Sequence, residues 1–300
     1  MYGLIRKSVL PNTNPIFVSP FPRAAVFPIL PLAALTMLIL VVVAAIFAPL
    51  ISPYQPLQGH IMNNLLAPTL LAGEGFPHLL GTDMLGRDVL SGVIHGARVS
   101  LLVGIASVVG AGILGTALGI LAGYFGGWLE EVVMRVVDVQ LAFPFILLAI
   151  VIMYVLGRGL GNVIVVLIIA SWPLYARVAR AQALRLRTSE FVLAARSLGA
   201  SRQRILWRHI LPNALTPLLV VATFAIPQMI IFEAALSFLG VGMPLEVVSW
   251  GSMLASGRNY LEQAWWVATL PGLAIMLTVL SVNILGDWLR DRLDPNLHLA

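Results

Sequence analysis

The sequence predicts an all-α integral membrane protein with six transmembrane helices. Of its 300 residues, 59% are hydrophobic and only 10% are charged, whereas a soluble domain carries roughly a quarter charged residues. The apolar residues gather in long uncharged runs, most of them close to the roughly 20 residues that a helix needs to cross the hydrocarbon core. The arginines lie in the gaps between these runs, so membrane topology explains the net charge of +5 better than a nucleic-acid partner does.

The first uncharged run covers residues 26–51. It is long enough to span the membrane once with some tilt. Pro28 and Pro31 suit the first turn of a helix, and Pro49 suits its end. Residues 1–25 precede this span, and we expect them to form a loosely ordered tail.

Residues 52–98 are mixed polar and rich in proline and glycine, so we expect an excursion on the far side of the membrane. The second span, residues 99–125, contains the pattern GxGxxG at 110–115. No strand precedes this match and its surroundings are apolar, so a dinucleotide site is excluded. The run also repeats a glycine every four residues, and such a face lets a neighbouring backbone approach closely. These glycines are Gly115, Gly119 and Gly123.

Four further spans are expected, so that residues 99–288 form a core of five transmembrane helices. A charged amphipathic segment at 128–138 is interpreted as a link at the membrane surface. Proline recurs inside the spans, and lipid tolerates broken helices where they face protein or a water-lined cavity, which favours a passage or a gate. The expected spans are 139–157, with Pro144; 160–176, interrupted by Pro173; 214–232, with Pro217 and Pro227; and 264–286, before a charged tail at 289–300.

A polar, strongly basic stretch from Arg185 to Pro217 separates the fourth and fifth spans. Ser189 is a suitable N-cap for a short helix that Gly199 ends. Ser201 can cap a second short helix, which Pro212 brings to an end. The sequence therefore predicts a helix, a sharp turn and a second helix within 185–212, too basic to enter lipid.

The distribution of basic residues predicts the orientation. If the basic stretch and both termini share one side, that side holds fourteen of the 18 lysines and arginines, and the other side holds four. Acidic residues do not account for this bias. The positive-inside rule then makes the basic stretch and both termini cytoplasmic.

Several ordered motifs resemble one family, the permeases of ABC importers, and within it the dipeptide/oligopeptide/nickel branch. The basic stretch resembles the cytoplasmic "EAA" loop of these proteins, with Leu193 standing where the motif usually has glutamate. The resemblance covers roughly His78 to Pro295. It rests on the segment His78–Val89, which is similar to HxxGTDxxGRD, on Ala194-Ala195, Gly199 and His209–Pro212, on FEAALSFLGVG at 232–242, and on RDRLDP at 290–295.

The resemblance implies the six-helix fold of a type I ABC-importer permease in the bacterial inner membrane. It further implies a second permease subunit, two cytoplasmic ATPases and an extracytoplasmic binding protein. ATP and magnesium would bind to the ATPases, and no cofactor would bind to this chain. The transported solute stays open among peptides, nickel complexes, glutathione and oligosaccharides. The residues implied in ATPase coupling are Glu190, Leu193, Ala194, Ala195, Arg196, Gly199, Ala200, Arg202, His209, Leu211 and Pro212.

Two further groups of residues are candidate sites. Glu233 is the one acidic residue inside an apolar run, and we expect it near the outer interface, within reach of headgroup water or a partner group. A structural or gating role is favoured over direct substrate binding, and with Met229 and Phe232 it could gate or line a pathway. The second group is a motif in the 52–98 excursion, whose charges predict an ion-pair cluster that anchors a loop, with substrate binding as the alternative. Its residues are Gly81, Thr82, Asp83, Gly86, Arg87 and Asp88.

Several chemistries are excluded. The chain has no cysteine, and its one lysine, Lys7, follows Arg6, so no phosphate-binding GxxxxGK[ST] loop is present. The five histidines lack metal-ligand spacing, and no catalytic constellation is evident. A self-contained secondary transporter or channel is the alternative, but it would place charged relays deep within several spans. A membrane enzyme would need polar residues clustered at the interface.

Overall fold

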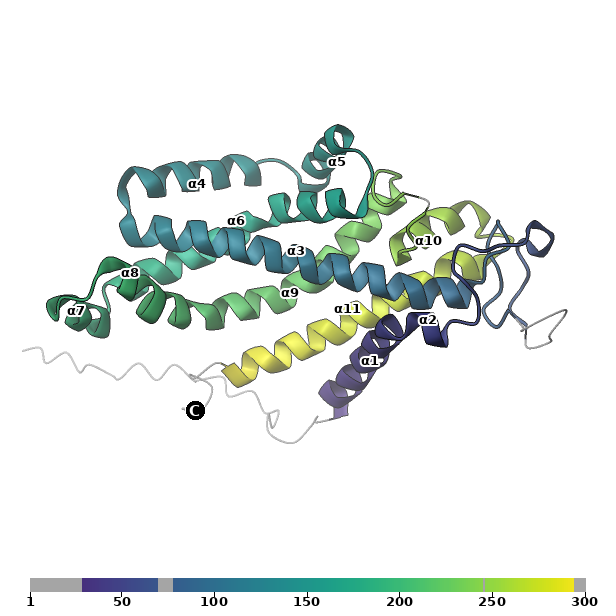
Figure 1. The fold of residues 1–300 in the computed structure, drawn as a ribbon, viewed down its shortest axis with the longest axis horizontal. Helices are drawn as coiled ribbons and strands as arrows, with labels where there is room; N and C mark the ends of the chain where they lie inside the picture. The colour runs from purple at the N-terminus through teal and green to yellow at the C-terminus, as the bar shows by residue number, and fades with distance from the viewer. Residues whose placement is uncertain (1–28, 70–77, 245, 294–300) are drawn as a thin grey trace, which may run out of the picture.

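The computed structural model describes residues 29–69, 78–244 and 246–293, and the predicted tail at 1–25 lies outside them. The described chain is helical, with two isolated β-bridges, Gly59–Arg87 and Thr82–Asp88, and no strand. Figure 1 shows a long bundle with α7 and α8 at one end, and with α10 and the segment before α3 at the other. The helices are α1 (Ile29–Ile46), α2 (Ala48–Ile51), η1 (Ile61–Asn63), α3 (Val89–Phe125), α4 (Gly127–Leu141), α5 (Phe145–Leu156), α6 (Leu160–Arg187), α7 (Glu190–Ser197), α8 (Arg202–Ile205), η2 (Leu206–Ile210), α9 (Leu211–Phe238), α10 (Trp250–Gly257), η3 (Arg258–Tyr260) and α11 (Trp265–Leu293).

Five helical segments in the described chain are long and apolar enough to cross a membrane. They are α1, α3, α6, the continuous rod from Arg202 to Phe238, and α11. A bent pair, α4 and α5, is the sixth candidate. The predicted all-α membrane fold is confirmed, with six spans when the bent pair counts as one.

The boundaries of the second and third spans differ from the prediction. Helix α3 starts at Val89, ten residues before the expected start, because Asp88 caps it by accepting a hydrogen bond from the Ser91 amide. Helix α4 continues to Leu141, the chain then turns by 96°, and α5 is too short to cross a membrane alone. Two charges that suggested a surface link are paired with α6, since Glu130 meets Arg180 and Asp138 meets Arg177, each at 2.5 Å.

The packing of α3 against α6 confirms the glycine face predicted in the second span. The three glycines lie against backbone carbonyl groups of α6 that also recur every four residues. A methyl group on any of them would come within 2.6 Å of a carbonyl oxygen, which real contacts do not allow. The pairs are Gly115 with Trp172, Gly119 with Ala176 and Gly123 with Arg180, at 2.4, 2.3 and 2.6 Å.

Pro173 does not interrupt α6, contrary to the prediction. A proline inside a helix leaves the carbonyl four residues earlier without its donor, and here that carbonyl belongs to Ile169. The side-chain amide of Gln140 in α4 donates to it at 2.5 Å and also accepts a hydrogen bond from the Trp172 indole at 3.0 Å. A side chain from a neighbouring helix thus replaces the missing bond.

Pro212 does not end the second short helix either. Helix α8 passes through the π-helical turn η2 directly into α9. In this turn the Leu211 amide donates to the Leu206 carbonyl, five residues back, just before the proline. The side-chain amide of Asn213 donates to the His209 carbonyl at 2.6 Å. The rod therefore continues through Pro212 by way of the wider turn.

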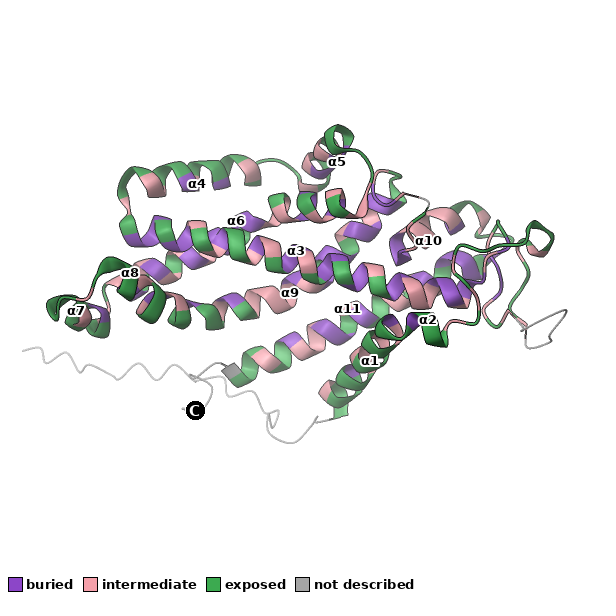
Figure 2. Cartoon of the chain, viewed as in Figure 1, coloured by how far each residue is buried: buried purple, intermediate pink, exposed green. Residues whose placement is uncertain are grey.

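The buried residues lie mainly where α3, α6 and α9 pack against one another (Figure 2). Many large apolar side chains remain exposed on the outside of the bundle, including Leu50 at 81% and Val155 at 78%. So much exposed apolar surface is unusual for a soluble monomer and is expected where helices face lipid or partner subunits.

Candidate functional sites

The basic stretch forms the predicted helix, turn and second helix, and it projects from one end of the bundle (Figure 1). Ser189 precedes α7, but its hydroxyl donates to the Leu186 carbonyl at 2.6 Å instead of capping the helix. Ser201 does cap α8, since its hydroxyl accepts a hydrogen bond from the Arg204 amide at 3.3 Å. The predicted cap at Ser201 is therefore confirmed. Ser189 occupies the N-cap position of α7, but its side chain does not cap the helix.

Gly199 ends α7 through a Schellman motif. The Ala200 amide donates to the Ala195 carbonyl and the Gly199 amide to the Arg196 carbonyl, both at 3.0 Å. This closure needs the left-handed backbone that Gly199 adopts, with φ of +84°. No atom lies within 4 Å of where its side chain would start, so the glycine faces open space.

One residue of α7 fixes this helix to the bundle. Val192 is fully buried, whereas Leu193 is 46% exposed and Leu198 is 89% exposed. The Phe191 ring lies 6.3 Å from the His209 ring of η2, so the two short helices contact each other. Of the predicted coupling residues, Glu190, Leu193, Ala194, Arg196, Gly199, Arg202 and Pro212 are exposed, and Ala195, Ala200, His209 and Leu211 are half-buried.

Glu233 is completely buried, so of the two expected environments the structure shows partner groups and not headgroup water. Its Oε1 accepts hydrogen bonds from the hydroxyls of Ser249 at 2.8 Å and Ser237 at 2.9 Å. Ser100 of α3 lies 3.5 Å from Oε2. Three serines from separate parts of the chain therefore surround the carboxyl group, which gives it a local polar environment.

The same cluster fixes α10 against α3 and α9. The Trp250 amide donates to Ser100 Oγ at 3.2 Å, and its indole donates to the Val93 carbonyl at 2.9 Å. A methyl group on Gly251 would lie 2.6 Å from Ala234 Cα of α9. We call Glu233, Ser100, Ser237 and Ser249 the serine–glutamate cluster.

The other two predicted pathway residues lie close to Glu233 on α9. Met229 is 2% exposed, and the hydroxyl of Ser171 in α6 lies 3.4 Å from its sulfur. The Phe232 ring stacks on Phe145 at the start of α5, with centroids 3.7 Å apart. Sequence reasoning missed Phe145 and Ser171, because nothing in the sequence shows that they face α9.

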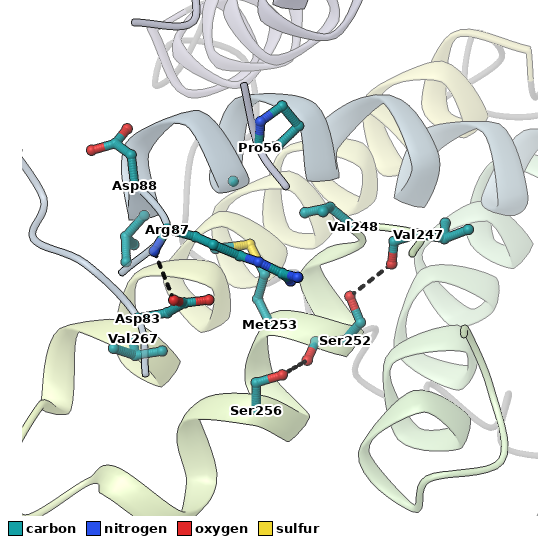
Figure 3. Close-up of a pocket in the computed structure, with 12 residues that line it drawn as sticks. Pro56, Asp83, Arg87, Asp88, Val247, Val248, Ser252, Met253, Ser256 and Val267 are labelled. Carbon is teal, nitrogen blue, oxygen red and sulfur yellow. Dashed lines mark hydrogen bonds between the residues drawn. The ribbon is translucent and has the colours of Figure 1, made fainter. Parts of the chain in front are cut away.

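The motif in the excursion does not form the predicted ion-pair cluster (Figure 3). Asp83 Oδ1 accepts from the backbone amides of Leu85 and Arg87, at 2.8 and 2.9 Å. Asp88 caps α3 and meets His78 Nδ1 at 3.0 Å. The Arg87 side chain has no ion-pair partner in the described part of the chain and extends along a cavity of about 50 Å³ beside Ser252.

The remaining residues of the motif hold the excursion to α11. The Trp266 indole donates to the Thr82 carbonyl at 3.1 Å, and a methyl group on Gly81 would lie 2.6 Å from the same indole nitrogen. Gly86 adopts a φ of +71° with the His60 carbonyl against it. These contacts indicate a structural role for the motif.

Comparison with known proteins gives the family. Residues 115–299 match the model described as the binding-protein-dependent transport system inner membrane component, and residues 30–68 match the N-terminal transmembrane domain of oligopeptide transport permease C.

Individual relatives agree with this assignment. The chain is 45% identical to the di/tripeptide transport system permease protein of Pseudomonas aeruginosa, over 90% of this chain and 89% of that protein. It is 42% identical to the glutathione transport system permease protein of Pectobacterium atrosepticum, over 88% and 86%. It is 38% identical to the oligopeptide transport system permease protein of Bacillus subtilis, over 90% and 86%.

A solved structure shares the fold. An inward-facing MetNI methionine ABC transporter matches with a TM-score of 0.55 and 21% identity, over 68% of this chain and 96% of that one. The all-helical bundle, the family models and the relatives lead to one assignment. The chain belongs to the family of binding-protein-dependent transport system inner membrane components, and it is a membrane-spanning permease subunit of an ABC importer.

Proposed function

We propose that this permease imports peptides or a related small solute and that α7 and α8 transmit the work of cytoplasmic ATPases to it. The named relatives support the solute class, since they include permeases for di/tripeptides, oligopeptides and glutathione. Selection among these solutes would be made mostly by a separate extracytoplasmic binding protein.

The single observation that carries the coupling role is the exposed, projecting α7. Leu193 and Leu198 are exposed on a segment that is too basic to enter lipid, and an ATPase surface docked on α7 would cover both. Glu190, Arg196 and Arg202 surround them without an ion-pair partner among the described residues. A socket on an ATPase could therefore bury the leucines and pair the charges.

The continuous rod connects the proposed ATPase contact to the rest of the permease. Because η2 joins α8 to α9 without a break, a displacement of the short helices moves α9 directly. Helix α9 carries Phe232, stacked on α5, and Glu233, which holds α10 at the opposite end (Figure 1). ATP binding and the access state of the pathway would be coupled through this rod.

The basic stretch and both termini lie in the cytoplasm, in a bacterial inner membrane. A second permease subunit completes the pathway, with membrane lipid around it. ATP and Mg²⁺ bind to the two ATPases, and this chain has no catalytic role of its own. The pathway would pass Met229 and Phe232.

Replacing Gly199 tests the coupling role. Gly199→Asp strains the Schellman turn and places a charge where the partner would approach, so solute-dependent ATP hydrolysis and uptake should be lost while membrane insertion is intact. Gly157→Asp is the matched control, because Gly157 has a φ of +79° and equally open surroundings in the α5–α6 turn. Normal solute-dependent ATP hydrolysis and uptake in the Gly199 variant would contradict the docking role.

Reconstitution separates this proposal from a self-contained secondary transporter or channel. The purified chain in liposomes should neither pump nor conduct a peptide unless ATPase subunits are added. Solute movement by the chain alone would support the alternative.

A further inference from the structure

A long apolar groove lies between α3 and the rod formed by η2 and α9. Its volume is about 560 Å³, and Tyr175 of α6 lies between the two walls. Neither wall contributes a charged side chain. The groove is open along its length, as Ile113 of α3 is 69% exposed and Leu219 of α9 is 55% exposed.

The groove has a direction. It begins at Leu206 and Trp207, next to the projecting short helices, and follows α9 as far as Ala222. Trp207 is 66% exposed, and tryptophan concentrates at the boundary between hydrocarbon and water. The aliphatic wall of Leu211, Leu215 and their neighbours extends from there toward the middle of the bundle.

Two arginines lie close in sequence to Trp207 at this end of the groove, although neither lines it. Arg204 lies one helical turn before Trp207, and Arg208 follows Trp207 directly. Both are exposed, and neither has an ion-pair partner among the described residues. The chain at this end of the groove therefore has two cationic side chains on either side of Trp207, and aliphatic side chains follow along α9.

We propose that this groove binds one acyl chain of an anionic phospholipid whose phosphate is held by Arg204 and Arg208. The order of side chains matches the order of groups in a lipid of the same leaflet, from headgroup through ester region to tail. At roughly 30 Å³ per methylene, about the volume of a water molecule in the liquid, the groove accommodates one chain of sixteen to eighteen carbons.

The bound lipid would have a consequence for transport, and this step depends on the proposed function. The arginines belong to α8 and η2, which join the coupling helix to α9. A lipid held there contacts α3 and the rod at once, so it resists a relative displacement of these two elements. The lipid composition of this leaflet would then change the free energy needed for the coupling movement.

Binding itself is tested with spin-labelled lipids. The intact transporter is reconstituted in phosphatidylcholine vesicles containing labelled phosphatidylglycerol or labelled phosphatidylcholine, and the immobilised fraction is measured. Each arginine near a membrane surface contributes about fivefold to anionic-lipid affinity. Arg204→Gln and Arg208→Gln should each weaken phosphatidylglycerol binding by about fivefold and leave phosphatidylcholine unchanged. Arg185→Gln is the control, since Arg185 is an exposed arginine at the end of α6 that does not adjoin the groove.

The apolar half of the site has its own test. Ala117 lines the groove, so Ala117→Phe should displace the immobilised lipid, whereas Leu114→Phe, on exposed α3 surface outside the groove, should not. Equal immobilisation of both lipids, unaffected by the arginine changes, would overturn the proposal. So would disulfide cross-linking of Leu215→Cys to a cysteine in the second permease, because that subunit would then fill the groove. Either result leaves the ATPase test at Gly199 unaffected.

Discussion

Removing the Glu233 carboxyl group should release α10 from the bundle. The perturbation is Glu233→Ala, compared with Glu233→Gln. In the alanine variant the hydroxyls of Ser249 and Ser237 lose an acceptor inside a site that has no access to water. The glutamine variant keeps one oxygen acceptor for these two serines and replaces the other carboxyl oxygen with an NH2 group.

The magnitude follows from the two short hydrogen bonds. Leaving a buried donor without its acceptor costs about 1–3 kcal/mol, and Ser249 and Ser237 donate at 2.8 and 2.9 Å. The third contact, from Ser100 at 3.5 Å, adds little. Glu233→Ala should therefore cost about 3–5 kcal/mol, and Glu233→Gln about 1–2 kcal/mol.

The assay combines thermal unfolding of the reconstituted transporter with labelling of α10. A fall of roughly 10 °C is expected for the alanine variant. The chain has no cysteine, so a single Ser256→Cys reports on α10 alone, and its reaction with a maleimide should speed up when the cluster is broken. Glu246→Ala, which removes an exposed carboxylate nearby, is the control. A Glu233→Ala protein that melts and labels like the wild type would refute the anchoring role.

Two further predictions concern the packing of α6. Gly119→Ala should lower stability by about 1–3 kcal/mol because its methyl group would lie 2.3 Å from the Ala176 carbonyl oxygen, whereas Gly161→Ala, in open surroundings, should change the melting temperature little. Gln140→Leu should cost about 1–3 kcal/mol by leaving the Ile169 carbonyl without a donor, and Gln140→Glu should cost a similar amount; a normal melting temperature in the leucine variant would show that the bond is dispensable.

The features that the sequence predicted well are local and periodic. Gly115, Gly119 and Gly123 recur with the period of a helix face, so close packing was predictable without knowing the partner. The left-handed turn at Gly199 and the cap at Ser201 depend on residues within one turn. The basic stretch stands out because its neighbours are uncharged.

Two of the errors depend on contacts between distant parts of the chain, and a third, at Pro212, depends on a local helix type that the sequence does not specify. Pro173 suggested a break, but Gln140 of another helix replaces the lost bond. Pro212 suggested an end, and a π turn accommodates it instead. Glu233 was predicted near water because its serine partners, 133 and 16 residues away for Ser100 and Ser249, cannot be identified from the sequence.

The outer motif shows a further limit. Asp83 and Asp88 lie near Arg87 in the sequence, which suggested ion pairs. Backbone amides satisfy Asp83, and the start of α3 with His78 satisfies Asp88. Asp88 is a suitable N-cap residue, but charge spacing favoured Arg87 as its partner over the backbone amides of α3.

The most direct test of the coupling role is the accessibility of one residue in α7's exposed turn. Leu198→Cys, in a chain otherwise free of cysteine, is treated with a membrane-impermeant maleimide from each side of sealed vesicles. The account predicts labelling from the cytoplasmic side alone and its loss when the ATPase subunits bind. Labelling from the outer side, or labelling that the ATPases leave unchanged, would contradict it.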